Sequence, residues 1–236
     1  FHDDALPLFE SRTEYVIYEA HVRDMTISSY TDIEHKGTFK GLTEKNRKTK
    51  GGMPAGFDYV KSLGITHLQL LPIYDYKSVD ETHPTASYNW GYDPAQYFVP
   101  EGSYASDLND PYSRIRDLKE MVKSFHEEGI RIVMDVVYNH TAEGNHEGLP
   151  INFKGLDNAG YYRLMPDNKN YYWNGTGCGN EMHTESPICH KMILDSLKYW
   201  MSEYKVDGFR FDLGTIIDKG TMQAIIDELP ASTILT

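Results

Sequence analysis

The 236-residue sequence predicts an α/β fold built on a parallel β-sheet. Short apolar stretches typical of strands alternate with stretches of helical periodicity, and the pattern ends on a further strand. One predicted strand, at 130–140, is apolar on both faces, which is typical of a parallel sheet covered by helices. With 40% hydrophobic and 25% charged residues, the composition allows a core of ordinary size.

Residues 1–13 are expected to form an N-terminal tail or linker, and the fold is expected to occupy residues 14–236. A segment from about 141 to 184 shows no clear periodicity and is rich in Gly, Asn, Tyr and Trp. We therefore expect a loop insertion there.

The first half of the fold begins with strands predicted at 14–22 and 66–76, because both stretches are rich in β-branched and aromatic residues. A short helix between them is expected to begin at Pro54 and to end at Gly64. The polar stretch from about 28 to 52 is expected to be a surface loop.

The second half continues the alternation of strands and helices. Ser113 is expected to cap a helix that Gly129 ends, and Ser186 and Pro187 are expected to open another. The remaining elements are strands at 130–140, 206–214 and 232–236, and a helix near 219–229.

The strand at 206–214, VDGFRFDLG, carries charges in an otherwise apolar stretch. Isolated charges in a core are costly, so such a stretch indicates a paired network or a site. Side chains alternate along a strand, which places Arg210 and Asp212 on one face and the phenylalanines on the other. A guanidinium beside a carboxylate favours the ionised acid that a nucleophile requires. A structural ion pair under a helix is the alternative interpretation.

A doubly wound sheet and a (β/α)8 barrel both fit the order of these elements. The glycine-rich stretch at 175–180 follows no predicted strand and opens no helix, so it does not indicate a dinucleotide site. Polar residues instead gather at the carboxyl ends of the predicted strands, where barrel enzymes build their active sites. They are Tyr74, Asp75, Asn139, His140 and Asp212.

Composition excludes several classes of partner. A formal net charge of -12 argues against nucleic acid, and no apolar run approaches the ~20 residues that span a membrane. No signal peptide opens the sequence, which favours a cytoplasmic over a secreted location. Cys178 and Cys189 do not make a disulfide framework, and with His183 and His190 they lack the paired spacing of a zinc site.

Three stretches together resemble the alpha-amylase superfamily, glycoside hydrolase family 13. DVVYNH (135–140) is similar to its strand-three motif, DGFRFDLG (207–214) to its strand-four motif, and YNWGYDP (88–94) to the signature of type I pullulanases. The resemblance covers essentially the whole chain. It implies a (β/α)8 barrel, of which roughly the first four βα units and strand five are present. The implied activity is retaining hydrolysis of α-1,6-glucosidic branch linkages in pullulan, starch or glycogen-type α-glucans.

The resemblance also implies roles for residues of these motifs. Asp212 would be the catalytic nucleophile, and Arg210 would orient and ionise it. His140 would bond hydroxyls of the sugar in the subsite at the cleaved bond, and Tyr92 would stack beneath that sugar. Asp93 is also expected to bind substrate.

Two further motif positions are expected to support the site. Asp135 lies deeper in its strand and would pair with Arg210. Asn139 resembles a residue that ligates calcium in many amylases, but debranching members often lack that ion, so we expect no metal or other cofactor. Trp90 is expected to pack on the core. Candidates for outer subsites are Tyr161, Tyr162, Tyr171, Tyr172 and Trp173.

The family's acid/base glutamate lies at the end of strand five, and a His-Asp pair follows strand seven. Neither is present in this sequence, which ends at Thr236. We expect the rest of the barrel C-terminal to Thr236, and we expect the 236 residues alone to be inactive. The alternatives are an isoamylase or glycogen-debranching enzyme, and a non-catalytic carbohydrate-binding or transporter-associated relative. The presence of Asp212, Arg210 and His140 favours an enzyme.

Overall fold

The computed structural model describes residue 9 and residues 11–236. Most of the predicted tail at 1–13 therefore lies outside the described residues. A short 3-10 turn, Arg12–Glu14, leads into the first strand. Among the described residues, no helix combines the length and the apolar character needed to cross a bilayer.

The centre of the fold is a five-stranded sheet in which every neighbouring pair is parallel and the strand order follows the sequence. The predicted parallel sheet is thus confirmed. Sequential order is the arrangement of a barrel wall, whereas a doubly wound sheet reverses direction at a switch point. The strands are β1 (Ile17–Ala20), β2 (His67–Leu70), β3 (Arg131–Val136), β4 (Gly208–Phe211) and β5 (Ile234–Leu235).

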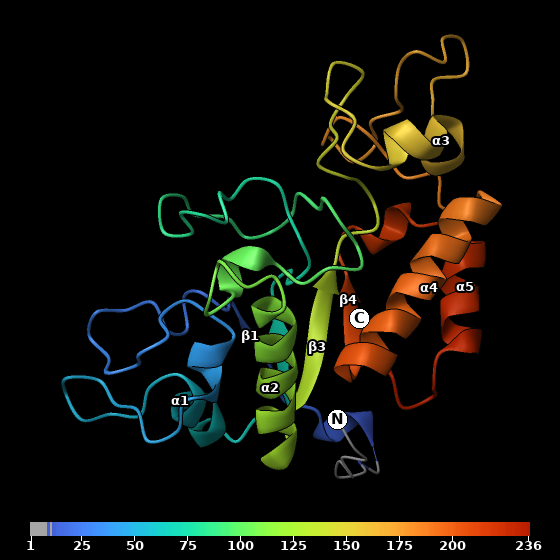
Figure 1. The fold of residues 1–236 in the computed structure, drawn as a ribbon. Helices are drawn as coiled ribbons and strands as arrows, with labels where there is room; N and C mark the ends of the chain where they lie inside the picture. The colour runs from blue at the N-terminus through green and yellow to red at the C-terminus, as the bar shows by residue number, and fades with distance from the viewer. Residues whose placement is uncertain (1–8, 10) are drawn as a thin grey trace.

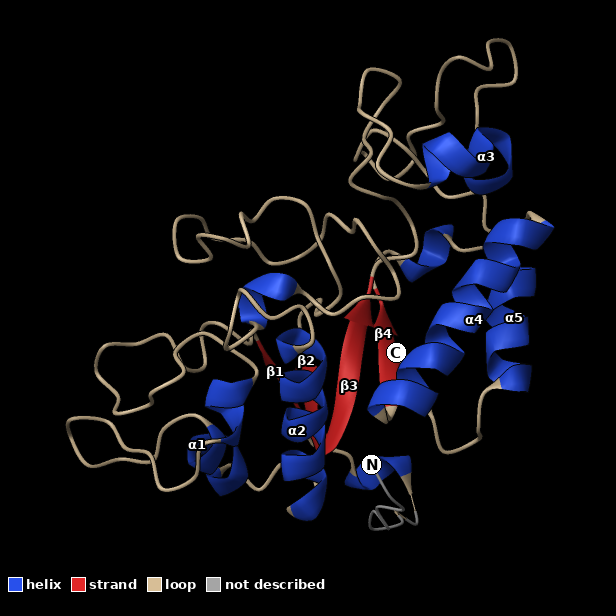
Figure 2. Cartoon of the chain, in the orientation of Figure 1, coloured by secondary structure: helices blue, strands red, loops and turns tan. Residues whose placement is uncertain are grey.

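A helix precedes each strand from β2 onward, and these helices lie along the outside of the sheet (Figure 1). They are α1 (Phe57–Ser62), α2 (Ser113–Glu127), α4 (Pro187–Tyr204) and α5 (Lys219–Glu228). The segment between β3 and α4 also holds α3 (Phe153–Tyr161), which lies beyond the arrowhead of β3 (Figure 2). The carboxyl end of the sheet is therefore overlaid by long loops.

The core forms where the outer face of the sheet meets these helices. Leu68, Ile132 and Phe209 from three strands are fully buried, and so are Phe125 of α2 and Trp200 of α4. Burying such side chains contributes about 1.5–3 kcal/mol each. This layer fixes the strands whose ends carry the candidate site.

Helix ends follow the predicted signals in part. The Ser186 hydroxyl accepts from the N–H of Cys189, as expected for an N-cap, and Gly129 follows α2 with φ of 74°. The prediction for Ser113 was wrong, because Ser113 is the first helical residue and its hydroxyl donates to Asp117, 2.9 Å away. The Ser113 hydroxyl therefore bonds a side chain within the helix and does not cap the first turn.

Two other expectations need correction. The strands are shorter than predicted, because residues such as 71–76 and 137–140 leave the sheet as loops. The stretch at 28–52 is not simply a surface loop, since Phe39 and Leu42 are fully buried. A 3-10 turn at Lys40–Thr43 directs these side chains into the core.

Candidate active site

The register of β3 and β4 creates the centre of the site. It places Asp135 directly opposite Arg210, and partners in register point to the same face. Arg210 Nη1 lies 3.1 Å from both carboxylate oxygens of Asp135 and 2.9 Å from Oδ1 of Asp212. Burial opposes charge on Arg210, but Asp135 and Asp212 outweigh it and raise the pKa of the guanidinium. One cation therefore joins two carboxylates.

Asp212 stands immediately beyond β4, where the chain turns. Its backbone N–H still donates to the carbonyl of Val136 at 2.9 Å, and the next residue, Leu213, adopts φ of 46°. A leucine in the left-handed region is strained by roughly 1–2 kcal/mol, and such strain gathers at functional sites. The Asp212 side chain is 18% exposed, so it remains accessible to solvent.

Asn139 completes the coordination of Asp212. Its Nδ2 lies 3.1 Å from Oδ2 of Asp212 and 2.8 Å from the Asp212 carbonyl oxygen. Arg210 and Asn139 thus each donate to a different carboxylate oxygen. The sequence placed Asn139 only as support, and the contact with Asp212 is new information from the structure. Two donors fix the orientation of a carboxylate far better than one.

His140 links this centre to the loop at 88–94. Its Nδ1 lies 2.5 Å from Oδ1 of Asn139, and its Nε2 lies 2.8 Å from the carbonyl oxygen of Tyr92. Burial lowers the pKa of His140, against the opposing effects of the Tyr92 carbonyl and the Asp212 charge. The imidazole therefore holds the loop at 88–94 against the residues that follow β3.

Tyr92 also contacts the buried carboxylate. Its hydroxyl donates to Oδ2 of Asp135 at 2.8 Å, and burial together with Asp135 raises the pKa of the phenol. Asp135 is fully buried, and burial raises its pKa to about 6 although Tyr92 and Arg210 oppose the shift. Asp135 thus supports both the tyrosine ring and Arg210, which extends the single partner expected from the sequence.

The rest of the loop forms a hollow beside Tyr92 of about 430 Å³. Asp93, expected to bind substrate, uses its carboxylate within the loop, accepting from Asn89 Nδ2 at 3.0 Å and from Ser78. The expectation that Trp90 packs on the core was wrong, because its side chain is 58% exposed. Its ring N–H donates to the Tyr88 hydroxyl, which holds it at the rim of the hollow.

The aromatic residues of the insertion divide into two groups. Tyr161 and Tyr162 are buried and serve packing, whereas Tyr171 and Trp173 are about half exposed, at 46% and 48%. Tyr172 is partly buried and donates to Asn158 at 2.6 Å. The two exposed rings are thus the ones available to a ligand.

Three acidic residues after β2 lie close enough together to share a cation. In the described part of the chain, no other group of three or more His, Cys, Asp and Glu side chains does so. Asp75, Glu81 and Glu101 each offer an oxygen within 4.8 Å of the others. Burial, then Glu81, raises the pKa of Asp75 to about 6, and burial raises that of Glu101 to about 7. Arg114 offsets part of this charge with an Nη2 that lies 2.6 Å from Glu81.

The raised pKa of Asp75 leads to a stability prediction. A carboxyl whose folded pKa exceeds its ordinary value contributes stability at acidic pH that is lost as pH rises through about 6. In buffer with a metal chelator, Asp75→Asn should therefore raise the free energy of unfolding relative to wild type by on the order of 1 kcal/mol at pH 8, seen as a higher melting temperature, and by less at pH 4.5. Glu120→Gln, an exposed control, should show no such difference. Equal shifts at both pH values would contradict the prediction.

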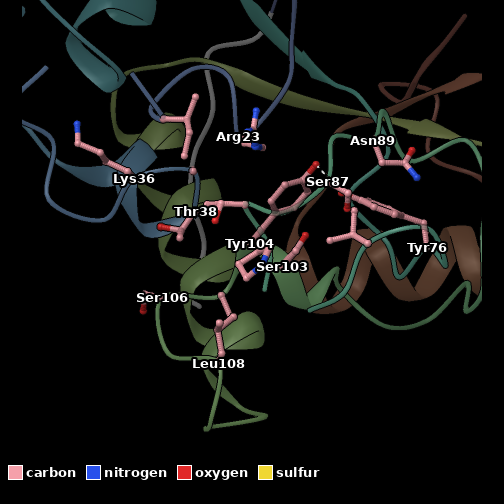
Figure 3. Close-up of a pocket in the computed structure, with 16 residues that line it drawn as sticks. Arg23, Lys36, Thr38, Tyr76, Ser87, Asn89, Ser103, Tyr104, Ser106 and Leu108 are labelled. Carbon is pink, nitrogen blue, oxygen red and sulfur yellow. Dashed lines mark hydrogen bonds between the residues drawn. The ribbon is translucent and has the colours of Figure 1, made fainter. Parts of the chain in front are cut away.

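A separate cavity of about 190 Å³ lies between the loop after β1 and the loops after β2 (Figure 3). Its polar lining is largely satisfied internally. Tyr76 donates to the Tyr104 hydroxyl at 3.0 Å, and the Lys36 ammonium turns to the carbonyls of Ser28 and Thr31 at 2.7 and 3.0 Å. None of the Asp212 centre lines it, so this cavity is not part of the candidate active site.

Comparison with known families now bears on this geometry. A family model described as "Alpha amylase, catalytic domain" matches residues 29–149, just over half of the 236 residues. The chain belongs to the alpha-amylase family. The strand-three residues Asp135 and Asn139 lie within the matched region, and Arg210 and Asp212 lie beyond it.

Individual relatives of the alpha-amylase family match more of the chain. This chain is 41% identical to a pullulanase of Bacillus subtilis and 38% identical to the chloroplastic isoamylase 1 of Oryza sativa. Each alignment covers 91% of this chain. A crystal structure of the Paenibacillus barengoltzii pullulanase, complexed with maltohexaose and alpha-cyclodextrin, superposes on 97% of the chain with a TM-score of 0.90 and 46% identity. The chain spans only 29%, 26% and 35% of these three proteins, respectively.

Proposed function

We propose that this chain is the N-terminal part of the catalytic barrel of a retaining glycoside hydrolase. Its substrates would be the α-1,6-glucosidic branch linkages of pullulan, starch or glycogen-type α-glucans. The observation that carries the proposal is the Asp212 carboxylate, held through both oxygens at the carboxyl end of a parallel sheet. A partly exposed carboxylate fixed in this way is suited to attack a sugar carbon.

In the proposed reaction Asp212 attacks the anomeric carbon as the bond to the leaving oxygen breaks. The leaving oxygen takes a proton from an acid, and a covalent glycosyl-enzyme remains until water hydrolyses it. Arg210 and Asn139 aim the carboxylate, and the ring of Tyr92 offers an apolar plate to the sugar. His140 and Asp93 hold the loop that carries Tyr92, and His140 is placed to meet sugar hydroxyls.

The acid of this reaction would lie in the rest of an eight-stranded barrel, C-terminal to Thr236. The limited share of the relatives that the chain spans, 26% to 35%, supports this view. The sequential parallel strands supply one wall of such a barrel. We propose no calcium at Asn139, because its side-chain oxygen faces His140 and its nitrogen faces Asp212.

The debranching assignment rests on similarity to a pullulanase and to an isoamylase, and the YNWGYDP loop favours the former. A non-catalytic relative is the alternative from another class. Such a protein has no need of a nucleophile that is held by two donors beside a strained turn. The contacts of Asp212 therefore favour an enzyme.

Products released from pullulan by the full-length protein test the proposal. Pullulan consists of maltotriose units joined by α-1,6 bonds, so α-1,6 cleavage should yield maltotriose, which chromatography separates from panose. Release of panose would indicate α-1,4 cleavage and would exclude the pullulanase-like activity. Release of linear chains from glycogen with pullulan left intact would assign the activity to the isoamylase or glycogen-debranching alternative.

A further inference from the structure

The insertion between β3 and α4 carries a groove of about 750 Å³ that the proposed reaction does not use. Its apolar wall includes Trp173, Leu164 and Pro166, and its polar rim includes Arg163 and Glu185. Volumes of roughly 300–1,000 Å³ are typical of ligand sites, which bury most of a small ligand. The groove is therefore large enough for more than one sugar ring.

Trp173 is held open to solvent by a rigid backbone. Two antiparallel bridges, Tyr162 with Met182 and Leu164 with Tyr172, fix this part of the insertion. The N–H of Trp173 donates to the carbonyl of Arg163 at 2.8 Å. An indole that is 48% exposed forgoes much of the free energy of burial, and a fixed aromatic face binds a ligand at little entropic cost.

The rim offers planar hydrogen-bonding groups at fixed positions. Arg163 Nη1 lies 2.5 Å from Glu181, its Nε lies 3.1 Å from Glu185, and these pairs hold the guanidinium beside the groove. The Glu185 side chain is 49% exposed and that of His183 is 34% exposed, so both retain atoms free for a ligand. An apolar plate flanked by such groups matches a pyranose, which has an apolar face and a ring of hydroxyls.

A hydrogen bond connects the segment that carries the groove to the Asp212 centre. The N–H of Met182 donates to the carbonyl of Asn139 at 2.9 Å, and the side chain of Asn139 contacts Asp212. A polymer held at Asp212 thus has a second potential contact on the same overlying segment. The second aromatic plate therefore favours a sugar polymer, rather than a small or charged metabolite, as the ligand of the groove.

We propose that the Trp173 groove is an additional binding site for an α-glucan chain, separate from the Asp212 centre, which retains long or branched polymers. This inference rests on the proposed function for its substrate class. It predicts that polymer affinity depends on Trp173, whereas the chemistry at Asp212 does not.

Kinetics of the full-length Trp173→Ala protein test this inference. Loss of a stacking ring should raise KM for amylopectin roughly 5- to 20-fold, with kcat within about two-fold of wild type. KM for a short branched oligosaccharide that fills only the Asp212 centre should stay unchanged. Tyr112→Ala, which removes an exposed ring (66% exposed) at the start of α2, is the control and should change neither constant. Unchanged KM for amylopectin in Trp173→Ala would overturn the inference.

A second measurement separates the groove from the proposed function. Maltohexaose should slow oxidation of Trp173 by N-bromosuccinimide several-fold, as located by peptide mass mapping, whereas cellohexaose should not. Trp90, exposed at the rim of the Tyr92 hollow, reports on the other site in the same sample. Protection of Trp173 in a protein that cleaves no α-1,6 bond would refute the proposed function and support the groove. Oxidation of Trp173 at the same rate with and without maltohexaose would overturn the groove.

Discussion

Asp212→Asn is expected to lower kcat on pullulan by roughly 10⁴-fold or more in the full-length protein, with little change in melting temperature. Asparagine keeps the size of the side chain and removes the charge that attacks the sugar. The fold should tolerate the change because Arg210 keeps both oxygens of Asp135 as partners, each 3.1 Å from Nη1. The guanidinium is therefore not left buried and unpaired.

The structural ion pair considered for this strand predicts the opposite pattern. It would cost about 3–5 kcal/mol of stability when broken, with activity falling only as the protein unfolds. Measuring kcat and melting temperature on the same preparations separates the two. Asp207→Asn is a matched control directly before the same strand, because Oδ2 of Asp207 lies 2.8 Å from both His126 Nε2 and the backbone nitrogen of Ile132, away from Asp212. It should lose stability and retain kcat.

Trapping locates the nucleophile directly. A 5-fluoroglycosyl fluoride should label Asp212, and peptide mass mapping should find the sugar on the peptide that contains it. A label on another carboxylate, or a folded Asp212→Asn protein with near-normal kcat, would show that the nucleophile is elsewhere.

Regular geometry explains what could be predicted from the sequence. The two-residue period of a strand places Arg210 and Asp212 on one face, and in the structure Arg210 contacts Asp212 while Phe209 is buried on the other. A parallel ladder brings neighbouring strand ends to one edge of the sheet, which is why the motifs after β3 and β4 meet. These relations depend only on local periodicity and on strand pairing.

Contacts that depend on loop paths could not be predicted in this way. The bond from Asn139 to Asp212 and the bond from Tyr92 to Asp135 join segments 73 and 43 residues apart, and no local pattern fixes such distances. The burial of Phe39 and the exposure of Trp90 have the same origin, because each follows from where a loop meets the helices or the solvent. The position of an asparagine at the carboxyl end of a predicted strand was the one available signal for the contact with Asp212.

Arg210→Met is expected to reduce kcat roughly 10²- to 10³-fold and to lower stability in a pH-dependent way. Without the guanidinium, Asp135 and Asp212 face each other with no cation between them. Burial already raises the pKa of Asp135 to about 6, and loss of Arg210 should raise it further, so the buried acid takes up a proton. Asp135 in the variant then contributes stability that is lost as pH rises beyond 6. The gap in melting temperature to wild type should accordingly widen from pH 6 to pH 8.

Arg210→Lys separates the charge from the shape of the guanidinium. Nη1 makes all three contacts with Asp135 and Asp212, so one nitrogen, rather than the fork, holds the carboxylates. A lysine ammonium carries three N–H donors on one nitrogen, against two on Nη1, and so can pair with the same carboxylate oxygens. Lysine should therefore recover most of the stability at pH 8 and leave kcat within roughly 10- to 50-fold of wild type. If lysine behaved like methionine, the planar guanidinium itself would be required. If both variants kept normal kcat, Arg210 would not be what aims Asp212, and Asn139 alone would have to hold the nucleophile.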